Sequence, residues 1–276
     1  MCIDRQAASA VIFASGNHVA GEMARLWYHT FSDLFSHRRL WLFPLLAGTS
    51  WFITLTTLLV RWLSLGRPRY PGQVNPDVPF VSDIAAQTFQ PVFIVGCTTT
   101  GVCFFGTVFA VHHVRYSPKF YGFTDDARWR QCVSLLALIT GLAAAVSLVM
   151  LSIFDTYYAH ARHYYLLMGT FGGLFVSALA TTVVWWDQAR GTGTVVFAGL
   201  QKWCLFNLFL VFSQFVVGIS FVTLIYSGHF YASRILEWCL TYIGSFWLLS
   251  FVGHTRFSEG EEAELEYQGE RQPLLV

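Results

Sequence analysis

The sequence has 276 residues and a formal net charge of +1; 55% of the residues are hydrophobic and only 12% are charged. Because a soluble globular protein carries about 25% charged residues, this composition excludes an ordinary soluble domain. The near-zero net charge gives no indication of nucleic-acid binding, and we expect no nucleic-acid partner. The six cysteines have neither the placement of a disulfide framework nor metal-knuckle spacing, and we expect no cofactor.

Six apolar runs divide the sequence, and each has about the 20 residues that a hydrocarbon core requires. Each run must be helical, because backbone groups within lipid have no water to bond. The sequence therefore predicts an all-α polytopic membrane protein with a bundle of six transmembrane helices. The runs are 41–63, 91–111, 131–153, 164–186, 203–226 and 234–253.

The distribution of Lys and Arg between the loops predicts the orientation of these spans. Basic residues are more numerous before the first run, in the second and fourth loops and in the tail than in the other loops. Positively charged loops tend to remain on the cytosolic side of a membrane. We therefore predict that both termini are cytosolic, and that the first, third and fifth loops face the lumen or the exterior.

Three segments follow from this topology. Residues 1–40 are a predicted cytosolic segment whose apolar spacing is compatible with a short helix on the membrane interface, and the true start is either Met1 or Met23. Residues 41–254 are the predicted transmembrane domain. Residues 255–276 are rich in Glu and are predicted to form a disordered cytosolic tail.

The tail ends in a pattern that resembles a sorting signal. Glu270 is followed, after three spacer residues, by the pair Leu274 and Leu275. This arrangement resembles the dileucine signal that clathrin adaptors bind. A cytosolic and disordered tail would be accessible to such an adaptor.

A polar hairpin lies between the third and fourth runs. Asp155 would lie at the carboxyl end of one helix, where the helix dipole disfavours an anion, whereas His160, Arg162 and His163 would lie at the amino end of the next, where it disfavours cations. Each group is poorly placed alone and well placed opposite the other. We expect the hairpin to be closed by its own charges, or to hold a ligand between them.

The predicted topology brings several candidate ligands to one face of the membrane. In the first loop, Ser82 or Asp83 is predicted as the N-cap of a short helix, and Asp83 could instead face the third loop; His229 lies in the fifth loop. His160 and His163 could bind one metal ion with Asp155 or Asp83 as the carboxylate. A bound Zn²⁺ could then activate water against a lipid ester. The alternative, which we favour, is a charge-clamped hairpin without a metal.

Charged residues are placed only near the ends of the predicted spans. Arg234 and Glu237, three residues apart at the start of the sixth run, are predicted to form a local ion pair. Because pumps and ion-coupled transporters need ionisable groups deep in the membrane, this placement argues against transport.

The topology and two short motifs resemble the Frag/DRAM/Sfk family, in particular its fungal Sfk-like branch. The likeness covers about residues 38–255 and implies that Asp83, Asp155 and His163 are signature positions. Family members often have an acidic residue after the later histidine, where this sequence has Tyr164. The residues that carry the resemblance are Pro79-Phe80-Val81-Ser82-Asp83, Phe154-Asp155-Thr156, His160 and His163.

The resemblance implies a multipass protein of membrane lipid homeostasis, in the plasma membrane or an endolysosomal or vacuolar membrane. Our first hypothesis is a non-enzymatic regulator or scaffold of lipid organisation, connected with phospholipid asymmetry, phosphoinositide signalling or autophagy. Its basic loop from Arg115 to Arg130 would contact an anionic phospholipid or a kinase partner. The alternatives are an exoplasmic metal-dependent hydrolase that remodels lipids, and a lipid carrier, which requires a polar cavity.

Overall fold

The computed structural model describes residues 39–70, 73, 77–86, 89–116, 126–156, 158–192 and 198–256. The chain divides into two compact units, Met1–Leu40 and Trp41–Val276, and all the described helices belong to the second. The predicted interfacial helix and the choice of start lie outside the described residues. The sorting signal of Glu270, Leu274 and Leu275 lies outside them too.

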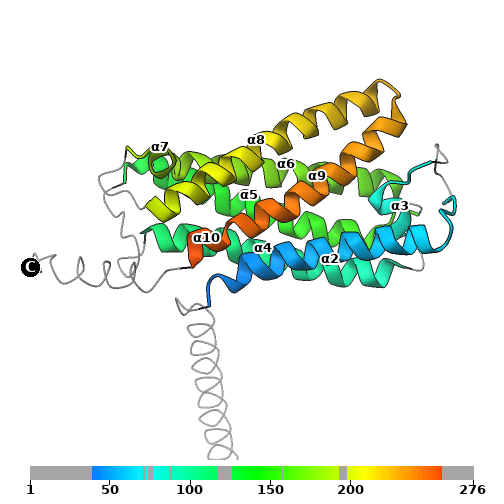
Figure 1. Cartoon of the computed structure of the whole chain (residues 1–276), viewed down its shortest axis with the longest axis horizontal. Helices are drawn as coiled ribbons and strands as arrows, with labels where there is room; N and C mark the ends of the chain where they lie inside the picture. Colours follow the sequence, from blue (N-terminus) through cyan, green and yellow to red (C-terminus); the bar gives the residue numbers. More distant parts are fainter. Residues whose placement is uncertain are drawn as a thin grey trace, which may run out of the picture. The chain divides into compact units, whose positions relative to one another are not determined.

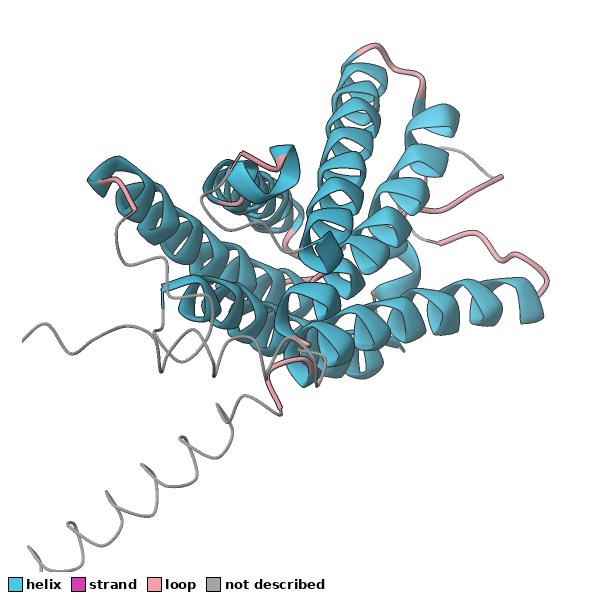
Figure 2. Cartoon of the chain, turned by 60° about the vertical axis from the view of Figure 1, so that its left-hand side comes forward, coloured by secondary structure: helices cyan, strands magenta, loops and turns pink. Residues whose placement is uncertain are grey.

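Six long helices form the second unit, and each is long and apolar enough to cross a membrane. This confirms the predicted all-α fold with six spans, and the part of the chain that the structure describes contains no strand (Figure 2). The long helices are α2 (Leu42–Ser64), α4 (Gln90–Tyr116), α5 (Arg128–Ile153), α6 (His160–Val184), α8 (Ala198–Tyr226) and α9 (Phe230–Ser250). The short helices are α3 (Val81–Ala85), α7 (Trp186–Arg190) and α10 (Val252–Thr255).

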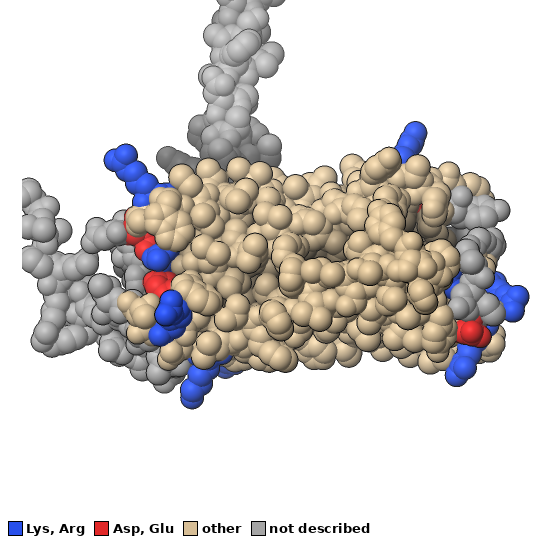
Figure 3. Space-filling model, turned by 90° about the horizontal axis from the view of Figure 1, so that it is seen from above, with Lys and Arg blue, Asp and Glu red and all other residues tan. Residues whose placement is uncertain are grey.

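The long helices run side by side, with α3 at one end of the bundle and α7 and α10 at the other (Figure 1). We call these the α3 end and the α7 end. The charged side chains gather at the two ends, and the surface between them is uncharged on the face seen in Figure 3. A chain that crosses the hydrocarbon layer needs this distribution, because a charge at the centre of a bilayer is costly.

Close contacts between helices depend on small residues. A Cβ added at Gly173 of α6 would lie 3.0 Å from the Cβ of Ala144 on α5, and one at Gly96 of α4 would lie 2.7 Å from Cγ2 of Thr54 on α2. Lipid tails are as apolar as leucine, so helices in a membrane gain from such close backbone approach.

An ion network closes the α7 end. The Arg115 guanidinium donates to both carboxylate oxygens of Asp187, at 3.3 and 3.1 Å, and its Nε donates to Asp126 Oδ2 at 2.9 Å. Arg130 Nη1 donates to the other oxygen of Asp126 at 2.6 Å. The Arg115 side chain is fully buried and also lies over the Trp185 ring. This network connects the ends of α4, α5 and α6 to α7.

Candidate functional site

The segment that leads into α3 is attached to one face of α9. The backbone N–H of Val81 donates to Glu237 Oε2 at 3.1 Å, and Arg234 Nη1 donates to the carbonyl of Val78 at 3.1 Å. Trp238 Nε1 donates to the carbonyl of Pro79, also at 3.1 Å. We predicted a local ion pair between Arg234 and Glu237; in the structure each makes a hydrogen bond to residues 78–81. These bonds hold α3 against the bundle.

Asp83 caps its own helix and also lies near the third loop. Its Oδ2 accepts the N–H of Phe80 at 3.0 Å, and the Arg234 guanidinium lies over the Phe80 ring at 4.8 Å. Burial raises the pKa of the Asp83 carboxyl, and the Phe80 N–H, Arg234, His163 and His160 act in the opposite direction. Asp83 therefore takes part in capping α3, whereas the second role that the sequence left open for it, facing the third loop, stays a prediction.

The hairpin between α5 and α6 is closed by contacts with backbone groups and a ring. Asp155 Oδ1 accepts the N–H of Tyr158 at 2.6 Å, and His163 Nδ1 donates to the carbonyl of Phe154 at 2.7 Å. Arg162 lies over the Phe154 ring at 5.6 Å. These contacts do not join Asp155 to a basic side chain. The predicted charge clamp between Asp155 and the basic residues therefore stays a prediction.

The predicted metal candidates differ in their surroundings. His163 is buried, whereas His160 and His229 are exposed at the starts of α6 and α9. Asp83 and Asp155 are engaged with the backbone as described above. Over the described ranges, no group of three or more His, Cys, Asp or Glu residues is placed to hold a metal ion.

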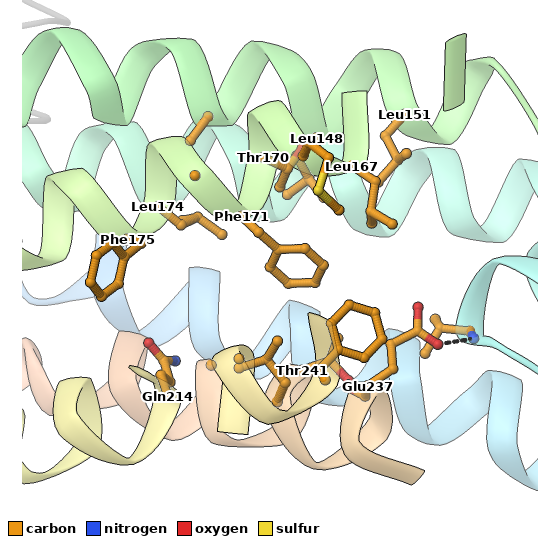
Figure 4. A pocket seen from close by; sticks show the side chains of 18 of the residues that line it. Leu148, Leu151, Leu167, Thr170, Phe171, Leu174, Phe175, Gln214, Glu237 and Thr241 are labelled. Atoms are coloured by element: carbon orange, nitrogen blue, oxygen red, sulfur yellow. Dashed lines mark hydrogen bonds between the residues drawn. The ribbon is translucent and has the colours of Figure 1, made fainter. Parts of the chain in front are cut away.

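A cavity of about 520 Å³ lies between the spans and reaches α3. Its lining is mostly apolar, and Figure 4 shows side chains from α5, α6, α8 and α9 turned toward it. Pockets that bind small molecules have volumes of about 300–1,000 Å³, so this cavity is large enough for a ligand. The apolar part of the lining includes Leu148, Leu167, Phe171, Phe175, Phe215 and Ile219.

The cavity is only partly enclosed by the bundle. Phe215, Ile219 and Val222 of α8 line it, and they are 43%, 52% and 40% exposed. Gly172 of α6 and Gly218 of α8 also line it, and a Cβ at either position would meet no atom within 4 Å. An apolar molecule could therefore enter sideways from the hydrocarbon layer.

Polar groups lie at the α3 end of this cavity. Glu237, Ser82 and His163 all line it, and Figure 4 shows the Glu237 carboxylate and Leu167 at the same end. His163 precedes Leu167 by one helical turn, so both lie on one face of α6. The sequence placed Glu237 at the start of the sixth apolar run, which begins at 234. In the structure α9 begins earlier, at Phe230, so Glu237 lies about two turns into the helix and is buried.

Residues 39–253, which contain the cavity and the α3 segment, match the Frag1/DRAM/Sfk1/Cwh43P N-terminal domain. The chain belongs to this family. The match confirms the resemblance inferred from the two motifs and the topology. As a Frag1/DRAM/Sfk1/Cwh43P family member with six membrane-spanning helices, the protein is an integral membrane protein.

A relative of known name within this family is protein sfk1 from Schizosaccharomyces pombe (strain 972 / ATCC 24843). It is 30% identical over 149 residues, which are 54% of this chain and 44% of the relative. The match therefore spans less than half of the curated relative. No solved structure matches the chain.

Proposed function

We propose that this family member is a non-enzymatic integral membrane protein that binds a lipid of the surrounding bilayer and thereby acts on membrane lipid organisation. The observation that carries the proposal is the apolar cavity between the spans, with its opening among lipid-facing side chains of α8. Burial of apolar surface from lipid gives little free energy, so specific binding needs shape and polar contacts. The cavity supplies a partly enclosed shape and a polar end.

The two alternatives have less support. A carrier needs a polar path for its cargo, and the lining of this cavity is mostly apolar. The hydrolase needs Asp83, Asp155, His160 and His163 to act on one ion or one ester. Three of these four make hydrogen bonds to nearby backbone groups, and no observation favours a shared ion.

The cytosolic partner that we propose, an anionic phospholipid or a kinase, would contact less of the second loop than the sequence indicates. Arg115 is buried against Asp126 and Asp187. Arg128 is exposed, and Lys119 lies outside the described residues. A test of recruitment should therefore neutralise Lys119 and Arg128 and leave Arg115 intact. The plasma or endolysosomal membrane, the cytosolic termini and the clathrin adaptor remain parts of the proposal.

Lipid binding is tested with a variant in which new side chains fill the cavity. Gly172→Leu combined with Gly218→Leu places two side chains in open space, so the variant should fold. The control is Ala143→Leu on α5, an exposed position that does not line the cavity. The full chain is reconstituted in vesicles that contain lipids with a photoactivatable acyl chain, and labelled positions are mapped by mass spectrometry.

We expect labelling of cavity positions in the wild type and the control, and its loss in the filled variant. Even labelling of all lipid-facing positions, unchanged by filling, would contradict lipid binding. The role in lipid organisation is tested in cells, by measuring surface phosphatidylserine with annexin. The filled variant should behave like cells without the protein, and rescue by this variant as complete as by wild type would refute that role.

A further inference from the structure

We infer that the lipid bound in the cavity carries an uncharged hydroxyl as its polar end, and that Glu237 and His163 hold this hydroxyl at the α3 end. The inference rests on the proposed lipid binding and specifies the ligand's chemistry. It depends on two buried polar side chains that line the same cavity from different helices.

His163 lines the cavity and has an unused hydrogen-bond acceptor. Its Nδ1 lies 2.7 Å from the carbonyl oxygen of Phe154, and a carbonyl oxygen only accepts, so Nδ1 carries the hydrogen. In a neutral imidazole the other nitrogen is then an acceptor. That atom, Nε2, is buried and has no hydrogen-bond partner among the described residues. A buried polar atom without a partner costs free energy, so a ligand that donates to Nε2 would be favoured.

Glu237 contributes the second polar contact. One carboxylate oxygen accepts the N–H of Val81, and Figure 4 shows the other oxygen turned toward the cavity. Glu237 lines the cavity and is only 4% exposed, so bulk solvent has little access to this second oxygen. A hydroxyl has one hydrogen, which it donates to His163 Nε2, and its lone pairs accept from the Glu237 carboxyl group when that buried group carries a proton.

Charged headgroups do not fit these contacts. The described residues that line the cavity include no Lys or Arg, so a phosphate would meet a carboxyl group and an imidazole lone pair without a compensating cation. An ammonium group would bring a second positive charge near Arg234, which lies one turn from Glu237. An ester carbonyl cannot donate to Nε2. A neutral hydroxyl, as in a diacylglycerol, a ceramide or a sterol, meets all these conditions.

The test is competition for the cavity in reconstituted full-length protein. A photoactivatable diacylglycerol labels the cavity, and the competitors are dioleoylglycerol, its acetylated derivative, sphingosine and dioleoylphosphatidylcholine. Dioleoylglycerol should compete about tenfold better than the acetylated form, the difference expected for one lost hydrogen bond that leaves a buried group unpaired. A ceramide and a sterol are used as further competitors, because they keep the hydroxyl and differ in the apolar part of the molecule. Their relative competition distinguishes which class of hydroxyl lipid the cavity binds.

Two variants connect the preference to the named residues. Glu237→Gln keeps an oxygen for the Val81 N–H and presents an amide to the cavity, and His163→Asn keeps a donor for Phe154 and removes Nε2. Each should reduce the tenfold preference for the hydroxyl, whereas Ala143→Leu should retain it. Labelled cavities with equal competition by the acetylated form, or by phosphatidylcholine, would overturn this inference and leave lipid binding intact. An unlabelled wild-type cavity would instead overturn the proposed function.

Discussion

The two ends of the bundle bury charged side chains in different ways. At the α7 end, Arg115 and Arg130 lie against Asp126 and Asp187, so charges of both signs meet directly. At the α3 end, Glu237 and His163 bond the backbone groups of Val81 and Phe154, and both side chains line a cavity. A network whose charges satisfy each other fastens loops together. A polar cluster with unused acceptors beside an apolar cavity is arranged to receive a ligand.

The largest effect should come from breaking the α7 end. Arg115→Gln leaves Asp126 and Asp187, whose side chains are only 9% and 14% exposed, without their main cation. Removing one partner of a buried ion pair costs about 3–5 kcal/mol, and we expect the free energy of unfolding in mixed micelles to fall by a similar amount. Lipid labelling of the cavity should persist in the fraction that folds.

A matched variant sharpens this prediction. Arg115→Gln combined with Asp187→Asn removes one charge of each sign and leaves Arg130 paired with Asp126, so it should recover much of the lost stability. Equal stability of the single variant and wild type would show that the network does not fasten the α7 end.

A smaller effect is expected at the α3 end. Glu237→Leu leaves the Val81 N–H without an acceptor, which costs about 1–3 kcal/mol, whereas Glu237→Gln keeps the bond. Hydrogen exchange should show faster exchange of the α3 amides in Glu237→Leu only. The same exchange rate in both variants would mean that this bond does not hold α3.

The smallest effect concerns the cap at Asp83. Asp83→Ala removes the acceptor for the Phe80 N–H and should cost about 0.5–2 kcal/mol, whereas Asp83→Asn keeps an oxygen there. The pKa of Asp83 is raised in the folded protein by burial, so its contribution to stability is complete below the unfolded pKa and is lost as pH rises through the folded pKa.

The free energy of unfolding, measured as a function of pH, tests the sign of the contribution of Asp83 to stability. Wild type should lose stability relative to Asp83→Asn as pH rises from about 4, the ordinary Asp value, toward neutrality. A difference that is constant with pH, or that changes in the opposite direction, would show that burial of this carboxyl is not what sets its pKa.

The sequence predicted those features that the membrane imposes on any chain. Backbone groups in lipid must bond within a helix, so hydropathy alone located the six spans. The short helix was also predicted, with Ser82 or Asp83 as its N-cap, but α3 begins earlier: Phe80 is the N-cap, and Asp83, the third helical residue, accepts the Phe80 N–H. The pairing of Arg115 with Asp187 was not predicted, because it joins positions 72 residues apart. The cavity was missed because it depends on how far α8 lies from α6, which no local pattern encodes.

Occupancy of the cavity tests the central claim most directly. Photoactivatable lipid is bound to wild type, to the filled variant Gly172→Leu with Gly218→Leu, and to Ala143→Leu, all at equal folded concentration. We predict labelling at cavity positions such as Phe171 and Phe215 in wild type and Ala143→Leu, and background labelling in the filled variant. Equal labelling at those positions in all three proteins would contradict a lipid site between the spans.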